Sequence, residues 1–128
     1  PHTPQPDFKS AYRTIIKQGW DDDKVIVSAF TQLDKVYLGR SDYWLAIDLY
    51  GHSLDKNKLS EREYYNNAIT ISSAEQLKQL METKTGYIIV DNMARIRLNK
   101  EINELISQQK LIFYNNTEQQ DPIWVFAF

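Results

Sequence analysis

The chain has 128 residues, of which 42% are hydrophobic and 25% are charged, and this composition predicts one globular domain with a single hydrophobic core. Its net charge is -2 and its Lys and Arg residues are scattered among Asp and Glu, so the sequence shows neither a basic footprint for nucleic acid nor a polybasic membrane patch. The absence of cysteine excludes a disulfide scaffold, a thiolate nucleophile and a thiolate zinc site.

The start of the chain predicts a linker followed by a helix. Residues 1–6, "PHTPQP", contain three prolines and lack an initial Met, so we expect a linker from a longer protein, followed by one domain over residues 7–128. Asp7 is a candidate N-cap, and Gly19 is expected to end the helix. The apolar positions between them have helical spacing: Phe8, Ala11, Tyr12, Ile15 and Ile16.

The next segments predict two strands that flank a short helix. Asp21 to Asp23 form a polar turn, and the branched residues of "KVIVSAF" (24–30) predict a buried strand. A short helix is expected through Leu33, Val36 and Tyr37, ending at Gly39. "DYWLAIDLY" (42–50) predicts the second strand, and the polar residues 51–67 predict a surface loop.

The second half of the chain continues this alternation. Ser72 and Ser73, each with Glu75 or Gln76 three residues later, form overlapping capping boxes, and Asn99 caps a further helix. The expected strands are "AITI" (68–71), "YIIVD" (87–91), "KLIFYNN" (110–116) and "PIWVFAF" (122–128), with "TEQQDP" (117–122) as a turn. The order predicts an α/β fold that is three-layered and Rossmann-like, with a mostly parallel sheet, helices on both faces and a C-terminal antiparallel hairpin.

Motifs for chemistry are few. The four glycines form no phosphate loop, and the two histidines, His2 and His52, are too far apart to suggest a metal site, so we expect no cofactor and no metal. Asp91 ends a strand, where α/β folds often bind ligands, although an aspartate there also serves as a cap. We therefore keep Asp91 as a ligand-binding candidate and favour the structural interpretation.

The segment "YLGRSDYWL" (37–45) is the strongest local candidate for a ligand site. Aromatic rings stack on sugars, and an Arg or Asp beside them can bind hydroxyl or phosphate groups, which makes Tyr37, Arg40, Asp42 and Tyr43 ligand-binding candidates. The alternative is structural: Arg40 and Asp42 form a salt bridge that fixes the turn, and Tyr43 and Trp44 point into the core from opposite faces of a strand.

Several of these segments resemble one family over nearly the whole chain. "DFKSAYRTII", "GWDDDKVIVSAF" and "VYLGRSDYWL" are similar to the region after the last membrane helix in prokaryotic members of the protein mannosyltransferase and aminoarabinose transferase superfamily. "EYYNNAITISSAEQLKQLM", "GYIIVD" and "LIFYNN…IWVFAF" resemble segments that follow in the same tails. The most specific piece is Tyr37-Leu38-Gly39-Arg40 with Asp42-Tyr43-Trp44.

The resemblance implies a particular kind of protein. Members of this superfamily are membrane glycosyltransferases of the GT-C class that use lipid-phosphate-linked sugar donors, and their catalytic carboxylate lies in an early loop between membrane helices. The chain is then expected to be a soluble extracytoplasmic domain at the cell membrane, non-catalytic by itself. Its partners would be the membrane-embedded portion of the same polypeptide and a lipid-linked sugar or glycan acceptor. The alternative is an independent α/β module that binds a ligand or a protein partner.

Overall fold

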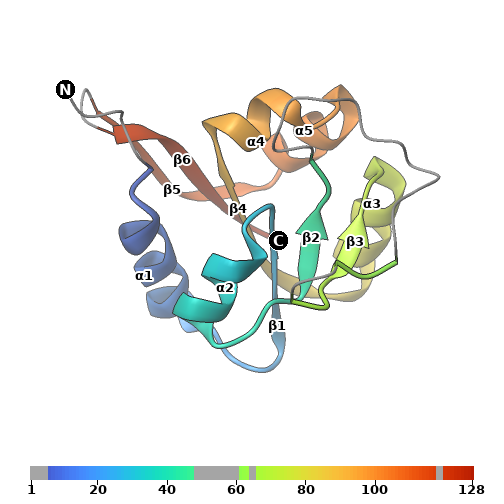
Figure 1. Ribbon diagram of the computed structural model, residues 1–128, viewed down its shortest axis with the longest axis horizontal. Coiled ribbons are helices and arrows are strands. Elements are labelled where there is room, and N and C mark those ends of the chain that lie inside the picture. Colours follow the sequence, from blue (N-terminus) through green and yellow to red (C-terminus); the bar gives the residue numbers. More distant parts are fainter. Residues whose placement is uncertain (1–5, 48–60, 64–65, 118–119) are drawn as a thin grey trace.

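The computed structural model describes residues 6–47, 61–63, 66–117 and 120–128 of the chain (Figure 1). These residues form five helices: α1 (Phe8–Gly19), α2 (Thr31–Leu38), α3 (Ala74–Thr83), α4 (Asn92–Arg97) and α5 (Lys100–Ser107). They also form six strands: β1 (Lys24–Ser28), β2 (Tyr43–Leu45), β3 (Ile69–Ile71), β4 (Thr85–Asp91), β5 (Lys110–Thr117) and β6 (Gln120–Ala127).

The strands make one mixed sheet in the order β3-β2-β1-β4-β6-β5. β1, β2, β3 and β4 run parallel to one another, whereas β6 is antiparallel to both β4 and β5. The predictions of an α/β fold, a mostly parallel sheet and a C-terminal antiparallel hairpin are therefore confirmed. The connection from β1 to β2 contains α2 and that from β3 to β4 contains α3, because a parallel neighbour can be reached only by a crossover.

Alternate residues of β4 belong to two different hydrophobic clusters, as the two-residue period of a strand requires. Ile88 and Val90 lie in one cluster with buried side chains from α3, α4 and α5. Tyr87 and Ile89 lie in the other cluster with buried side chains from α1 and α2. Burial of both faces accounts for the near-continuous apolar sequence of this strand, which is buried from Gly86 to Asp91.

Predicted caps begin three of the helices. The Asp7 carboxylate accepts a hydrogen bond from the Ser10 N–H at 3.1 Å, and the Asn99 side chain accepts one from the Ile102 N–H at 2.9 Å. At α3 only one of the two expected capping boxes forms: Ser73 and Gln76 bond reciprocally. The amide N–H of Ser72 also donates to the Gln76 side chain, so Gln76 takes the place expected for Glu75.

Two predicted boundaries differ from the structure, and one helix was not predicted. Of the expected strand 42–50, only Tyr43–Leu45 forms a strand, β2, and Ala46 and Ile47 follow it without strand structure. Residues 48–50, linker residues 1–5 and most of the predicted loop 51–67 lie outside the described residues. The predicted turn 117–122 is wrong, because Gln120 to Pro122 belong to β6 and pairing continues to Thr117 opposite Gln120. α4 was not predicted at all, since its six residues are too few to display a helical period.

The β5–β6 hairpin has irregular register at two points. Leu111 and Phe113 pair with the consecutive residues Phe126 and Val125, which leaves Ile112 as an extra residue in β5. A second shift lies between Asn115 and Thr117. β5 is the last strand of the sheet order, so its outer edge has no neighbouring strand among the described residues.

Gly86 is required by the pairing of β1 with β4. A Cβ atom at this position would lie 2.1 Å from the carbonyl oxygen of Val25 on the neighbouring strand, which is far inside van der Waals contact. The glycine therefore permits the backbones of β1 and β4 to approach each other at the start of both strands.

Candidate functional site

The segment from Tyr37 to Asp42 connects α2 to β2 and begins with a helix end. Gly39 adopts the left-handed conformation, with φ 85°, and its N–H donates to the Lys35 carbonyl at 3.1 Å, as is typical of a C-terminal glycine. Leu38 is buried, and its carbonyl accepts a hydrogen bond from the Trp20 indole N–H at 3.2 Å. The glycine thus ends α2 and turns the chain toward the sheet.

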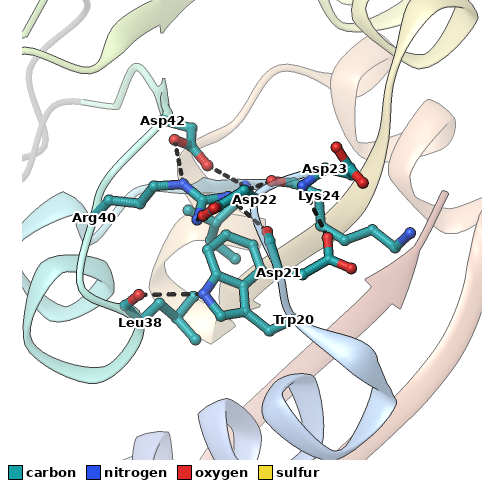
Figure 2. Close-up of polar contacts among 9 residues, drawn as sticks. Trp20, Asp21, Asp22, Asp23, Lys24, Leu38, Arg40 and Asp42 are labelled. Carbon is teal, nitrogen blue, oxygen red and sulfur yellow. Dashed lines mark hydrogen bonds and ion pairs between the residues drawn. The ribbon is translucent and has the colours of Figure 1, made fainter.

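Arg40 is held by contacts with two separate stretches of chain (Figure 2). Its Nε donates to the Asp42 carboxylate at 3.2 Å, and Nη2 donates to the backbone carbonyls of Asp21, at 3.0 Å, and Lys24. Nη1 lies 3.6 Å from the exposed carboxylate of Asp22. The guanidinium carbon lies 4.1 Å from the ring centroid of Trp20, within the range of a cation–π contact. All three guanidinium nitrogens therefore have partners within the domain.

Asp42 joins the amino-terminal ends of neighbouring strands. One carboxylate oxygen accepts from Arg40, and the other accepts from the N–H of Ile26 in β1 at 2.9 Å. The backbone carbonyl of Asp42 accepts from Ile69 of β3 at 2.9 Å. The salt bridge between Arg40 and Asp42 is thus confirmed, and both of its members secure the turn from α2 into β2.

The two tyrosines of the segment have different surroundings. The Tyr37 ring stacks on Tyr12 of α1, with centroids 4.8 Å apart and planes 11° apart, and 37% of Tyr37 remains exposed. Tyr43 is half-buried against the cluster of Val27 and Ile88, and burial raises the pKa of its phenol. Trp44 is also half-buried, so neither ring is fully enclosed as the structural alternative from the sequence would have it.

Asp91 lies at the carboxyl end of the parallel strands, whereas Arg40 contacts their amino-terminal end. Its buried carboxylate accepts a hydrogen bond from the Ala94 N–H at 2.8 Å and caps α4. Burial raises the pKa of this carboxyl group. Arg40 contacts Lys24, the first residue of β1, which pairs with Thr85, so Asp91 is six residues further along the parallel strands, or about 20 Å. The predicted candidates therefore do not converge on one site.

A buried polar network was missed by the sequence analysis. Asp34 of α2 is fully buried, and its carboxylate accepts hydrogen bonds from the Tyr12 hydroxyl and the Ser28 hydroxyl, both at 2.6 Å. The Ser28 hydroxyl also accepts from the Phe30 N–H at 3.1 Å. Burial raises the pKa of Asp34 to about 7, although the two hydrogen bonds act in the opposite direction. No sequence signal marked Asp34, which has the usual appearance of a polar residue in a short helix.

Three open hollows on the described part of the surface lie away from these residues. Open hollows lie between α3 and α5 and beside β3, and none of the five predicted candidates lines them. Within the described parts of the chain, no group of three or more His, Cys, Asp or Glu side chains is placed to hold a metal ion. No helix in those parts is both long and apolar enough to cross a membrane.

Comparisons with protein-family models, with curated proteins and with solved structures found no match. The structure by itself defines the class of the protein as an α/β domain with a mixed six-stranded sheet. We define a structural clasp as Trp20, Asp21, Lys24, Arg40 and Asp42, of which Arg40 and Asp42 come from the "YLGRSDYWL" segment. Binding of a ligand by Tyr37, Arg40, Asp42, Tyr43 or Asp91 stays a prediction.

Proposed function

We propose that this chain is an extracytoplasmic domain of a membrane glycosyltransferase that uses a lipid-phosphate-linked sugar donor, and that the domain is non-catalytic by itself. The sequence resemblance supplies the family. The observation that carries the non-catalytic part is the clasp: the Arg40 guanidinium and both oxygens of the Asp42 carboxylate are bonded within the domain. Arg40 and Asp42 therefore serve structural contacts, which supports a non-catalytic role for this segment.

The same proposal extends to the architecture and the partners. We propose that the sheet, with one hydrophobic cluster on each face, is a three-layer Rossmann-like domain. Its partner would be the membrane-embedded portion of the same polypeptide at the outer face of the cell membrane. In that position the domain would brace the membrane part or position a lipid-linked sugar or a glycan acceptor.

The native polypeptide provides the direct test. An antibody raised against residues 7–128 is used on fractionated cells, together with sequencing of the coding region upstream of Pro1. We expect an integral membrane band that is much larger than the 15.1 kDa of this chain, with hydrophobic spans encoded in the same frame. A band near 15.1 kDa that is released from membranes, or a start codon at the first position, would contradict the proposal.

A transfer assay tests whether the domain acts alone. The isolated chain and the full-length protein are each given polyprenyl-phosphate hexoses, and release of the sugar from its lipid is measured. We expect release with the full-length protein alone. Any turnover by the isolated chain would refute its non-catalytic role, and loss of that turnover in Arg40→Lys or Asp91→Asn would assign it to these residues.

Measurements of thermal stability with added ligands distinguish the alternative, an independent ligand-binding module, from the glycosyltransferase domain. A specific ligand at one hundred times its dissociation constant adds about 2.7 kcal/mol to the free energy of unfolding. A shift of that size with a nucleotide would favour the independent module, because parallel α/β sheets often bind nucleotides at the carboxyl ends of their strands. A shift with polyprenyl phosphate or glycan alone would favour the glycosyltransferase domain.

A further inference from the structure

The outer surfaces of α1 and α2 combine cations with exposed apolar side chains. We define the α1–α2 face by Lys9, Arg13, Lys17 and Ile16 of α1 with Val36 and Tyr37 of α2. The exposed fractions are 52% for Ile16, 72% for Val36 and 37% for Tyr37. Exposed apolar residues on two adjacent helices can mark a contact surface, provided that another property of the surface identifies the partner.

Helix geometry gathers cations that are dispersed in the sequence. Lys9, Arg13 and Lys17 are spaced by four residues and therefore project from one side of α1, and Ile16 lies on that side at i+7 from Lys9. Tyr12, on the neighbouring flank of α1, stacks on Tyr37, so this side of α1 borders α2 (Figure 1). The cations that are scattered in the linear sequence thus lie on one side of α1 together with Ile16.

The charge of the face is only partly offset, because Arg13 lies close enough to the Asp7 carboxylate, the N-cap of α1, for an electrostatic interaction. Lys9, Arg13 and Lys17 are exposed, and none of the three forms a salt bridge with another described residue. Asp34 is the only acidic residue within α1 and α2, and it is fully buried. Arg40, by comparison, is paired with two aspartates. Acidic residues flank both ends of α1, with Asp7 before it and Asp21 to Asp23 after it, so contact with an anionic partner is expected through the middle of the helix, around Arg13 and Ile16.

We infer that the α1–α2 face docks on the surface of an anionic lipid bilayer. Cations beside a bilayer are attracted to acidic headgroups, and apolar side chains among them can enter the boundary between headgroups and acyl chains. A nucleic-acid backbone would satisfy the cations but would leave Ile16 and Val36 against a hydrated polyanion. The bilayer is therefore the partner that uses both properties of the face.

Vesicle co-sedimentation of the isolated 128-residue chain tests the inference. Vesicles of phosphatidylcholine mixed with phosphatidylglycerol are expected to bind the chain, and vesicles of phosphatidylcholine alone are expected to bind at least about tenfold more weakly. Binding should fall when salt rises from about 0.1 M to about 1 M, because the Debye length drops from about 10 Å to about 3 Å. Failure to bind the anionic vesicles at low salt would overturn the inference.

Matched variants locate the binding surface. Lys9→Glu with Arg13→Glu and Lys17→Glu should reduce binding at least about tenfold. The control, Lys78→Glu with Lys84→Glu and Lys110→Glu, changes the net charge equally but on α3, its C-terminal cap and β5, and should bind nearly as the unaltered chain does. Equal losses in both triple variants would reduce the effect to net charge and overturn the inference.

Two further measurements test the contribution of the apolar side chains to vesicle binding and the rival partner, nucleic acid. Ile16→Ser with Val36→Ser keeps all charges and should weaken vesicle binding several-fold, with circular dichroism confirming that each variant is folded. Duplex RNA offered at the same salt should bind more weakly than the anionic vesicles. RNA binding that is lost in the α1 triple variant, without vesicle binding, would assign the face to nucleic acid and refute the inference.

The inference rests on the proposed membrane location, but the two can fail separately. If the native polypeptide is an integral membrane protein and the isolated chain ignores vesicles, only the docking surface is wrong. If the chain binds anionic vesicles and the native protein is a 15.1 kDa chain released from membranes, only the glycosyltransferase assignment is wrong.

Discussion

The guanidinium of Arg40 bonds to the turn before β1 and to Asp42 before β2 while it lies on the Trp20 ring. Lysine keeps the charge but lacks the planar fork and the stacking surface. Arg40→Lys should therefore lower the free energy of unfolding by about 1–2 kcal/mol, a modest value because 32% of the Arg40 side chain is exposed. Urea denaturation followed by circular dichroism measures the loss.

A matched control tests whether the clasp depends on its bonds or on local charge. Asp22 faces solvent and contacts only Nη1 of Arg40, so Asp22→Asn should leave the urea midpoint unchanged. Equal midpoints for the unaltered chain and Arg40→Lys would show that the fork contributes nothing, and would reopen Arg40 to a ligand role.

Asp34 should make stability depend on pH. Its pKa is about 7 in the folded chain against 3.8 for an unperturbed aspartate, so the folded state binds the proton more tightly. Its contribution is fully present below about pH 4 and is lost as pH rises through about 7, amounting to roughly 4 kcal/mol in total. Asp34→Asn removes the titrating group, and the difference between the two pH profiles isolates this contribution.

The expected profile has a definite sign. The free energy of unfolding of the unaltered chain should decrease, relative to that of Asp34→Asn, between about pH 4 and pH 7, and the two curves should run parallel above that range. A difference that increases with pH would mean that the hydrogen bonds from Tyr12 and Ser28 outweigh burial and keep the carboxylate ionised.

At the scale of elements, α4 depends on the residue before it. Asp91 caps this six-residue helix from a buried position, and its charge is unfavourable there, as the raised pKa indicates. Asp91→Ala should cost about 1–2 kcal/mol in thermal or urea unfolding, because the Ala94 N–H loses its acceptor. Asp91→Asn keeps an acceptor oxygen and should cost much less.

The same pair of variants separates structure from ligand binding at Asp91. If Asp91→Asn is as stable as the unaltered domain and the full-length protein keeps its activity, the carboxylate serves the helix alone. A stable Asp91→Asn protein with lost transfer activity would instead support the ligand-binding prediction for this residue.

At the scale of the whole molecule, residues 7–128 are expected to unfold as one domain. Trp20 packs against the cluster of α1 and α2, and Trp124 packs against the cluster of α3, α4 and α5, so tryptophan fluorescence reports on both. Fluorescence and far-ultraviolet circular dichroism should give one common midpoint, and removal of residues 1–6 should not change it. Two separated midpoints would contradict a single domain.

Much of the fold could be predicted because local signals agreed with the tertiary structure. The caps at Asp7, Ser73 and Asn99 and the branched residues of β1 and β4 each act within a few residues, and sequence patterns record such interactions. α4 escaped prediction because six residues form fewer than two turns, so periodicity carries little information.

The site was less predictable because its chemistry depends on distant contacts. Arg40 and Asp42 are neighbours in sequence, and their salt bridge could be anticipated from that spacing. The carbonyls of Asp21 and Lys24 that complete the clasp, and the Tyr12 and Ser28 hydroxyls around Asp34, come from segments that only the folded chain brings together. Residue type alone therefore could not distinguish a ligand-binding arginine from a structural one.

The extra residue at Ile112 affects how the molecule behaves in a crowded solution. Residues 111–114, Leu-Ile-Phe-Tyr, have the composition of a segment that adds strands from other chains and grows into fibrils. Because β-bulges bend a strand and disrupt its ladder, we expect the irregular β5 to be a poorer template for an incoming strand than a regular one. A hairpin without the extra residue would have a regular outer edge strand, and we expect such a domain to aggregate edge to edge more readily.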